Sequence, residues 1–448
     1  MRPIKIALWG FLAALTLLWL LAETPWALPT GVFGWRTVLV QYTGLLAIGS
    51  MSLATLLALR PRWPERPLQG LDKMYRLHRW LGIAALTAAV IHWLWTQGVK
   101  WAVGFGWLAR PHRGPRPSPP SGLEGWLAGQ RGWAEQVGEW AFYAVVVLIL
   151  IALIRRIPYH WFYKTHRLIA VAYLVLVYHA LVLVKFSYWT TPLGVVLAVL
   201  LAGGAFAAVV SLFGGIGARR RVAGKIVSLQ YYRPLRVLEM ELRMTGRWPG
   251  HQAGQFAFMT ADPEEGPHPF TIASSWEGGA PTILLIAKEL GDYTRTLPQR
   301  LHPGQAVTLE GPYGRFTFDD GRPQQIWIGA GIGITPFIAA MKRRAAQPTL
   351  ERAPQVDLFH TTADYDPTAI AKLRTDAEAA GVRLHLLVDA RDGYLTGERV
   401  RVEAPEWREA GIWFCGPPGF GAALRKDFAG VGFPVAERFH QELFELRG

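Results

Sequence analysis

The 448-residue sequence predicts a multi-domain protein in which an all-α, six-helix transmembrane bundle precedes a small antiparallel β-barrel and an α/β domain. Long apolar runs fill the first half of the chain and predict the bundle. Short β-branched and aromatic runs separated by Gly and Pro, from 222 to about 318, are typical of a barrel. From about 323, strands alternate with helical segments around a glycine turn, which indicates an α/β unit with a parallel sheet. We therefore expect domains at 1–215, 216–322 and 323–448.

Six apolar runs are long enough to cross a bilayer. They lie at about 4–22, 35–59, 76–97, 138–154, 166–184 and 191–213. The start of the fourth run depends on whether Trp133 to Trp140 lie at the membrane interface. The first run could be read as a signal peptide, but it lacks a convincing small-residue cleavage site and more spans follow, so we interpret it as a retained helix.

The net charge of +14 comes from Lys and Arg that gather beside the apolar runs. This pattern indicates membrane topology and attraction to the lipid bilayer, and no nucleic-acid-binding signature accompanies it. Most of these cations lie on one alternate set of flanks, so the positive-inside rule predicts a multi-pass protein of the cytoplasmic membrane with both termini in the cytoplasm. The 98–136 loop then lies outside, and we expect it to be irregular and long enough to cap the outer face of the bundle. A single cysteine, Cys415, excludes internal disulfides, an iron–sulfur cluster and a cysteine zinc site.

Two histidines stand near the ends of the third run, His78 and His92, with no ionisable residue between Arg79 and His92. Fourteen helical steps place them roughly 21 Å apart along the axis and on one face. The fifth run adds His166 at its start and His179 thirteen residues later. These thirteen steps leave about 140° of mismatch, so this helix must overwind or His166 must lie at a frayed end.

By topology, one histidine of each helix lies at the cytoplasmic level, and these two form the inner pair, His78 and His166. The other two form the outer pair, His92 and His179. Two such pairs at matched depths are what two six-coordinate b-type haems need, since neutral imidazole is a good iron ligand. The alternatives are structural histidines bonded to neighbouring carbonyls and, for the inner level, the rival ligand His160 in the 155–164 loop.

Three motifs in the second half of the chain carry chemistry. A glycine turn, Gly329 to Phe337, lies between a strand (325–329) and a helix (335–346), where a pyrophosphate could bind; a plain strand–helix turn is the alternative. The stretch His268 to Ser275 reads by itself as a strand end with hydroxyl groups. Cys415-Gly416-Pro417-Pro418-Gly419 follows the last predicted strand (411–415), at the carboxyl edge of the sheet where ligands bind.

Together these residues resemble the ferric reductase and NADPH oxidase superfamily, in which a six-helix, two-haem membrane domain is fused to a ferredoxin-reductase-like flavin and nicotinamide module. The resemblance covers nearly the whole chain. It rests on both histidine spacings and then, in chain order, on His268-Pro269-Phe270-Thr271, Lys288-Glu289-Leu290-Gly291-Asp292-Tyr293-Thr294-Arg295, Gly311-Pro312-Tyr313-Gly314, the glycine turn and Cys415-Gly416-Pro417. It implies an FAD-binding barrel domain at 216–322 and a Rossmann-like NAD(P)-binding domain at 323–448.

The resemblance also implies roles for individual residues. The flavin would be lined by His268, Pro269, Phe270 and Thr271, with Thr271 near the reactive ring edge, and Gly291 and Thr294 would hold the FAD pyrophosphate beside Lys288. The nicotinamide dinucleotide would lie against Gly331, Gly333, Thr335 and Pro336, with Cys415 and Gly416 close to the nicotinamide. Phe444 looks like the aromatic residue that covers the flavin, with Phe439 as the alternative and domain packing as the other role. Thr271, Cys415 and Phe444 are thus the expected catalytic residues.

The activity that the resemblance implies is electron transfer from cytoplasmic NADPH or NADH, through FAD and two haems, to an acceptor outside. Oxygen-reducing relatives usually carry a second histidine one helical turn beyond the outer ligand, but Thr96 stands there, so oxygen and ferric chelates both remain candidate acceptors. Arg36, near the outer end of the second span, could help to hold an anion. Asp364 would repel the 2′-phosphate of NADPH, although Arg391 could compensate. Two other readings stay open: a transporter or sensor regulated by a nucleotide, and a membrane-anchored flavin reductase that feeds a separate partner.

Overall fold

The computed structural model describes residues 2–23, 29–109, 121–154, 156–278, 282–347 and 354–442. The chain divides into two compact units. One unit comprises Met1–Leu68 and Lys73–Ile216, and the other comprises Gln69–Asp72 and Gly217–Gly448.

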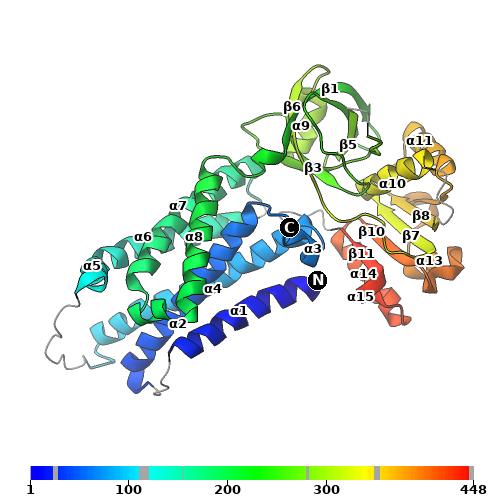
Figure 1. Ribbon diagram of the computed structural model, residues 1–448. Coiled ribbons are helices and arrows are strands. Elements are labelled where there is room, and N and C mark those ends of the chain that lie inside the picture. The colour runs from blue at the N-terminus through cyan, green and yellow to red at the C-terminus, as the bar shows by residue number, and fades with distance from the viewer. Residues whose placement is uncertain are drawn as a thin grey trace. The chain divides into compact units, whose positions relative to one another are not determined.

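The first unit is a bundle of helices, and among the described residues six of them are long and apolar enough to cross a membrane (Figure 1). These six are α1 (Arg2–Ala22), α2 (Gly31–Ala58), α4 (Leu71–Gly104), α6 (Arg131–Leu153), α7 (Tyr159–Leu183) and α8 (Pro192–Leu212). Two short helices, α3 (Glu65–Leu68) and α5 (Gly122–Gly129), lie between them in the chain. The six predicted spans are therefore confirmed.

The helices run further than the hydropathy pattern indicates. The 98–136 segment, predicted to be irregular, is helical up to the end of α4 at Gly104 and again in α5 and α6, while residues 110–120 lie outside the described residues. Trp101 on α4 and Trp133 and Trp140 on α6 are exposed on these extensions. Amphipathic aromatic side chains suit the membrane–water interface, so a helix can continue there without the apolar composition of a span.

Small and aromatic side chains hold the bundle together. The α8 sequence is apolar on every face, and its Gly204 lies so close to Tyr173 of α7 that an added Cβ would come within 2.0 Å of the Tyr173 hydroxyl. The same hydroxyl lies 2.8 Å from Oγ of Ser52 on α2. Close approach at small residues is how transmembrane helices pack without a hydrophobic driving force between them.

The second unit begins with a six-stranded antiparallel sheet in the order β4-β3-β6-β1-β2-β5. Its strands are β1 (Arg221–Tyr232), β2 (Val237–Met244), β3 (Phe256–Thr260), β4 (His268–Thr271), β5 (Thr282–Lys288) and β6 (Ala306–Tyr313), and α9 (Asp292–Arg300) follows β5. One isolated antiparallel bridge pairs Ile272, just after β4, with Leu285 of β5. Alternate residues of β2 and β5 are buried, as expected for an antiparallel sheet with one face on a core.

The rest of this unit is an α/β fold whose five-stranded parallel sheet has the order β11-β10-β7-β8-β9. The strands are β7 (Gln324–Ala330), β8 (Gln355–Thr362), β9 (Arg383–Val388), β10 (Gly411–Cys415) and β11 (Phe439–Gln441). The helices are α10 (Thr335–Ala346), α11 (Pro367–Ala379), α12 (Asp389–Asp392), α13 (Gly397–Glu403), α14 (Pro418–Gly430) and α15 (Val435–Arg438). The predicted α/β class is confirmed, and β7 and β10 are buried along their whole length.

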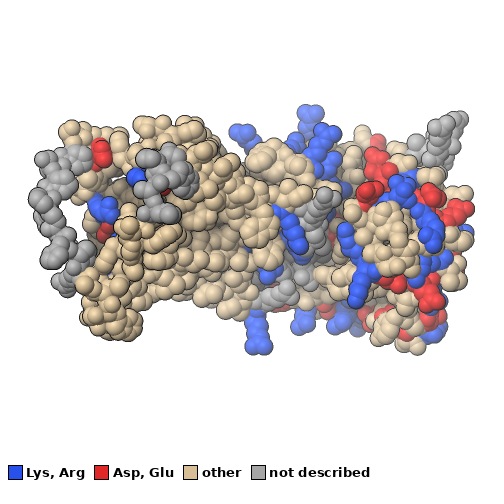
Figure 2. All heavy atoms as spheres, turned by 90° about the horizontal axis from the view of Figure 1, so that it is seen from below, with Lys and Arg blue, Asp and Glu red and all other residues tan. Residues whose placement is uncertain are grey.

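Charged side chains are distributed unevenly over the surface (Figure 2). The atoms over the long helices are almost all uncharged, whereas Lys, Arg, Asp and Glu crowd the part of the chain that contains the α/β fold. This contrast agrees with a lipid-facing bundle and a water-facing second unit.

Candidate functional site

The bundle brings the four predicted histidines together as two pairs, each with one ring from α4 and one from α7. The ring centroids of His78 and His166 are 6.0 Å apart, and those of His92 and His179 are 6.3 Å apart. Metal–imidazole bonds in proteins are about 2 Å long, so a metal ion held between two imidazole nitrogens places the ring centroids roughly 6 to 6.5 Å apart. Both pairs therefore fit a group bound on two sides by imidazole.

Backbone carbonyls of neighbouring helices orient three of these rings. Nδ1 of His78 lies 2.8 Å from the carbonyl oxygen of Ala54 on α2, and Nδ1 of His92 lies 2.9 Å from that of Val40 on the same helix. Nδ1 of His179 lies 2.8 Å from the carbonyl oxygen of Ala134 on α6. A carbonyl only accepts, so Nδ1 must carry the proton and donate it, which leaves Nε2 unprotonated and able to bind a metal.

The inner pair corrects two expectations about the fifth span. Since α7 begins at Tyr159, His166 lies two turns inside the helix and not at a frayed end, and His160 lies in the first turn of this helix and not in a loop. The structure pairs His166, and not His160, with His78. The helix starts early because its first residues are aromatic and basic, which is a composition that suits the membrane interface but lowers the hydropathy.

A cavity of about 290 Å³ surrounds the outer pair. Apolar side chains of α2, α4, α6, α7 and α8 line most of it, and polar groups line the rest, among them Arg36, Gln41, Thr96, Lys100, Arg131 and Glu135. An apolar cavity with a few charged groups and two facing imidazoles has the chemistry that a haem requires, since its ring is apolar and its two carboxylates need cationic partners. Thr96, one helical turn beyond His92, donates its hydroxyl proton to the carbonyl of Trp93 at 2.8 Å.

The predicted flavin residues lie on β4 and beside α9. The ring of His268 stacks on that of Tyr293 with centroids 3.8 Å apart, which joins the two motifs. The Thr271 hydroxyl is buried and, within the part of the chain that the structure describes, has no hydrogen-bond partner. Such an orphaned group is costly unless a ligand satisfies it, so Thr271 fits a hydrogen bond to a flavin edge. Burial lowers the pKa of His268 to about 4, so this ring is neutral at neutral pH.

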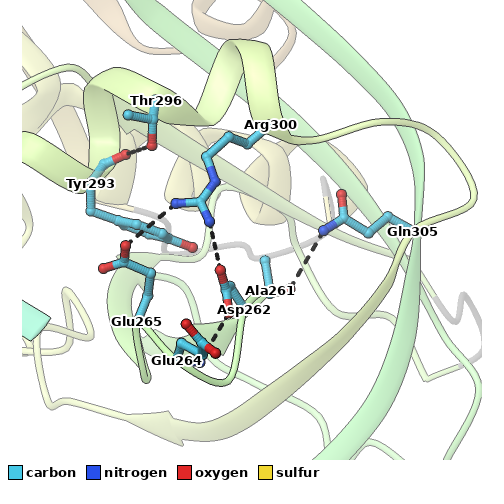
Figure 3. A network of polar contacts seen from close by, with 8 residues as sticks. All are labelled: Ala261, Asp262, Glu264, Glu265, Tyr293, Thr296, Arg300 and Gln305. Carbon is cyan, nitrogen blue, oxygen red and sulfur yellow. Dashed lines mark hydrogen bonds and ion pairs between the residues drawn. The ribbon is translucent and has the colours of Figure 1, made fainter.

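An arginine fixes α9 against the loop that leads into β4 (Figure 3). The Arg300 guanidinium, at the end of α9, contacts the carboxylate of Asp262 at 2.6 Å and that of Glu265 at 3.4 Å. Thr294 caps the other end of the helix, because its hydroxyl accepts the N–H groups of Leu290 and Gly291, each at 3.0 Å. The structure therefore places Gly291 and Thr294 at a helix N-terminus, where a pyrophosphate is favoured.

The glycine turn and the Cys415-Gly416-Pro417 motif meet at the carboxyl ends of β7 and β10. Gly333 lies against the backbone of β10, so an added Cβ would come within 2.1 Å of the Cys415 carbonyl oxygen. Gly416 in turn lies against Ala330, with 2.7 Å between an added Cβ and the Ala330 Cβ. Gly331 has a φ of +54°, and Thr335 and Pro336 begin α10 and are buried. The expected dinucleotide residues are thus brought together at one sheet edge.

A second cavity, of about 100 Å³, lies within this unit between the two sheets. Its lining includes Lys288 at the end of β5, Gly331 of the turn, and Asp364 after β8. Nζ of Lys288 lies 3.1 Å from a carboxylate oxygen of Asp364. Arg391, the residue expected to compensate a 2′-phosphate, contacts Asp392 at 2.9 Å.

Of the three expected catalytic residues, Phe444 and Cys415 are not seen at the site in the way Thr271 is. Phe444 lies outside the described residues. Its alternative, Phe439, is buried in the α/β core and pairs with Ile412 across the sheet. The Cys415 side chain is fully buried in a hydrophobic cluster, and burial raises the pKa of its thiol, so it is not a thiolate. At the sheet edge it is the backbone carbonyl of Cys415, and not its thiol, that lies against the glycine turn at Gly333.

Sequence reasoning missed several residues that build these sites. Tyr293, quoted within a motif but given no role there, stacks on His268, which is 25 residues earlier in the chain, and Arg300 contacts Asp262, 38 residues earlier; only the fold shows these contacts. The carbonyls of Val40, Ala54 and Ala134 leave no mark in the sequence, because every residue has one.

The fold and its sites define a class: a six-helix membrane bundle with paired histidines, joined to a flavin-reductase-type unit. The family model described as "Ferric reductase like transmembrane component" matches residues 43–177, which contain all four histidines. The model described as "FAD-binding domain" matches residues 222–317. The chain belongs to the ferric reductase and NADPH oxidase superfamily.

Three curated relatives are similar to parts of the chain. An "NADPH oxidoreductase" of Mycobacterium tuberculosis is 29% identical over 48% of this chain and 53% of its own length. "Ferric reduction oxidase 4" of Arabidopsis thaliana is 31% identical over 31% of this chain and 21% of its own. "NADPH oxidase 1" of Rattus norvegicus is 33% identical over 24% and 20%. The chain thus spans about half of the first relative and about a fifth of the other two.

Among solved structures, the Amycolatopsis cytochrome P450 reductase GcoB is similar at 21% identity, with a TM-score of 0.42 over 50% of this chain and 70% of that chain.

Proposed function

We propose that the protein is an NAD(P)H-dependent transmembrane oxidoreductase of the cytoplasmic membrane, with both termini in the cytoplasm. It moves electrons from cytoplasmic NAD(P)H, through FAD and two bis-histidine b-type haems, to an extracytoplasmic acceptor, either oxygen or a ferric chelate. The observation that carries this proposal is the presence of two imidazole pairs on α4 and α7 with centroid separations of 6.0 and 6.3 Å. The superfamily to which the chain belongs supports the same function.

The bundle would hold one haem at each histidine pair. When bound, FAD accepts a hydride and releases its electrons singly, and the haems relay single electrons across the low-dielectric layer. The chain's contribution is position: two long helices keep the inner and outer pairs a fixed number of turns apart. Carbonyls on α2 and α6 hold Nδ1 protonated, so the unprotonated Nε2 atoms of His78, His92 and His179 would be the ones that bind the iron.

The second unit would bind the flavin and the dinucleotide. Thr271 supplies a buried hydroxyl for the flavin edge, and neutral His268 with Tyr293 supplies an aromatic wall. The turn from Gly331 to Gly333 leads into the N-terminus of α10, where a dinucleotide pyrophosphate would be stabilised. Thr271, Cys415 and Phe444 remain the residues proposed to lie nearest the hydride that is transferred.

The test is anaerobic reduction of purified full-length protein by NADH or NADPH, with flavin and Soret absorption followed together. Reduction of a split, low-spin haem spectrum, and its reoxidation by oxygen or by a ferric chelate, is the expected result, and the faster oxidant identifies the acceptor. His92→Leu should remove one haem and stop reoxidation while flavin reduction continues. The proposal fails if holoprotein carries flavin but no haem and His92→Leu changes nothing.

A further inference from the structure

Each histidine of the outer pair lies against a glycine of a neighbouring helix. A Cβ added to Gly138 on α6 would lie only 1.9 Å from Nδ1 of His179. A Cβ added to Gly44 on α2 would lie 3.1 Å from both Nδ1 and Cε1 of His92. The first distance leaves no room for a side chain, and the second is tighter than nine in ten real Cβ contacts.

Both glycines stand four residues after the carbonyl that their histidine contacts. Val40 precedes Gly44, and Ala134 precedes Gly138. In an α-helix the carbonyl of residue i points at residue i+4, whose Cβ tilts back toward the N-terminus over that carbonyl. A side chain at i+4 therefore crowds the approach to the carbonyl, and glycine leaves it fully open to an approaching imidazole.

The inner pair does not use this device. His78 reaches the carbonyl of Ala54, and the residue four positions on is Ala58, the last residue of α2. Ala58 carries a Cβ, so an alanine in the last turn of α2 still leaves the Ala54 carbonyl within reach of His78. The glycine gaps are thus seen at His92 and His179, and the carbonyl contact of His78 provides an internal reference.

We propose that Gly138 and Gly44 are positioning residues of the outer haem site, an inference that rests on the proposed function. They admit the rings of His179 and His92 to carbonyls that hold Nδ1 protonated. A hydrogen bond from Nδ1–H makes Nε2 more basic, and this favours the oxidised metal and lowers its reduction potential. In Gly138→Ala the new Cβ collides with the His179 ring, and rotation of this ring relieves the collision at the lowest energetic cost. A side chain can rotate, whereas the backbone of α6 would have to move as a whole helix. The bundle then folds, but Nε2 turns away from its partner.

The experiment compares four variants of the full-length protein in detergent. Gly138→Ala and Gly44→Ala are the tests. Gly132→Ala, on the same helix α6 with nothing within 4 Å of the added Cβ, is the matched neutral control. Gly204→Ala places a Cβ 2.0 Å from the Tyr173 hydroxyl and controls for a clash of similar size away from the histidines. The readouts are the ratio of haem to FAD and the midpoint potential of each haem by redox titration.

Gly138→Ala should retain one haem per FAD instead of two, with the spectrum and potential of the remaining inner haem unchanged. Gly44→Ala should retain both haems, with the potential of one shifted upward. Gly132→Ala should match the wild type, and Gly204→Ala should keep both haems with unchanged potentials even where it lowers the stability of the bundle. Two haems with unchanged potentials in Gly138→Ala overturn the proposal, and so does loss of the same haem in Gly204→Ala. If Gly138→Ala yields no folded protein, the potentials of Gly44→Ala decide alone. A wild type without haem instead refutes the proposed function.

Discussion

Replacement of Gly333 by alanine should weaken dinucleotide binding, because this residue sets how closely the glycine turn approaches β10. The added Cβ would lie 2.1 Å from the Cys415 carbonyl oxygen, 2.6 Å from its carbon and 3.0 Å from the Gly416 nitrogen. All three atoms are backbone, so no side chain can rotate to relieve the contact. The turn must therefore move away from β10 by more than an ångström to reach the 3.4 Å of ordinary contact.

The expected size follows from the cost of overpacking a well-packed site, which is about 1 to 3 kcal/mol. The variant relieves this strain by moving the turn away from β10, and NADH binding must then restore the close position at the same cost. At about 1.4 kcal/mol per factor of ten, NADH binding weakens by roughly 5- to 150-fold. The assay is stopped-flow reduction of the flavin in full-length protein at increasing NADH concentration. The NADH concentration for half-maximal rate should rise by about this factor, with haem and FAD contents unchanged.

Two variants in the same region serve as controls. Gly419→Ala, just past β10, has nothing within 4 Å of its Cβ and no positive φ, so it should match the wild type. Gly331→Ala has an open Cβ position but a φ of +54°, so its effect should come from backbone strain of about 1 to 2 kcal/mol. An unchanged NADH dependence in Gly333→Ala, equal to that of Gly419→Ala, would refute the reasoning.

Three further predictions concern single residues of the second unit. Since burial lowers the pKa of His268 to about 4, the unfolded chain binds more protons between pH 6.5 and pH 4, and stability should fall by up to about 3 kcal/mol as the pH drops through this window. In His268→Gln the melting temperature should depend less on pH in this window, and an identical pH profile would contradict the burial argument. Asp364→Asn should raise the ratio of kcat/KM for NADPH to kcat/KM for NADH about fivefold or more, because one negative charge next to a 2′-phosphate is removed. Lys288→Met breaks the same ion pair but should lower this ratio. Equal effects of the two variants would mean that loss of the ion pair, and not the charge of Asp364, causes the change. Arg300→Met should increase FAD release, measured by fluorescence, by a few-fold, since an exposed ion pair contributes about 1 kcal/mol or less. The control is Arg401→Met, which breaks an ion pair with Asp427 in the α/β fold and should leave FAD release unchanged. Equal FAD release in the two variants would mean that the α9 contacts do not support the flavin site.

Local patterns in the sequence determined much of the architecture. The predicted bounds of β10 (411–415) and of α10 (335–346) match the structure, because Gly416 ends the strand and Pro336 marks the start of the helix. The start of α7 was missed by seven residues, since aromatic and basic interface residues continue a helix without raising its hydropathy. This error displaced His160 into a loop and His166 to a helix end.

The sequence by itself determined which residue types stand at which spacing: four histidines on two apolar helices, and glycines at the ends of predicted strands. It could not determine which groups face one another, because contacts such as Lys288 with Asp364 or Gly138 with His179 join segments far apart in the chain. Tertiary packing decided that each outer imidazole reaches a carbonyl through the space left by a missing side chain. Hydropathy and helical periodicity report the environment of one helix, whereas a hydrogen bond between two helices depends on the distance and rotation of both.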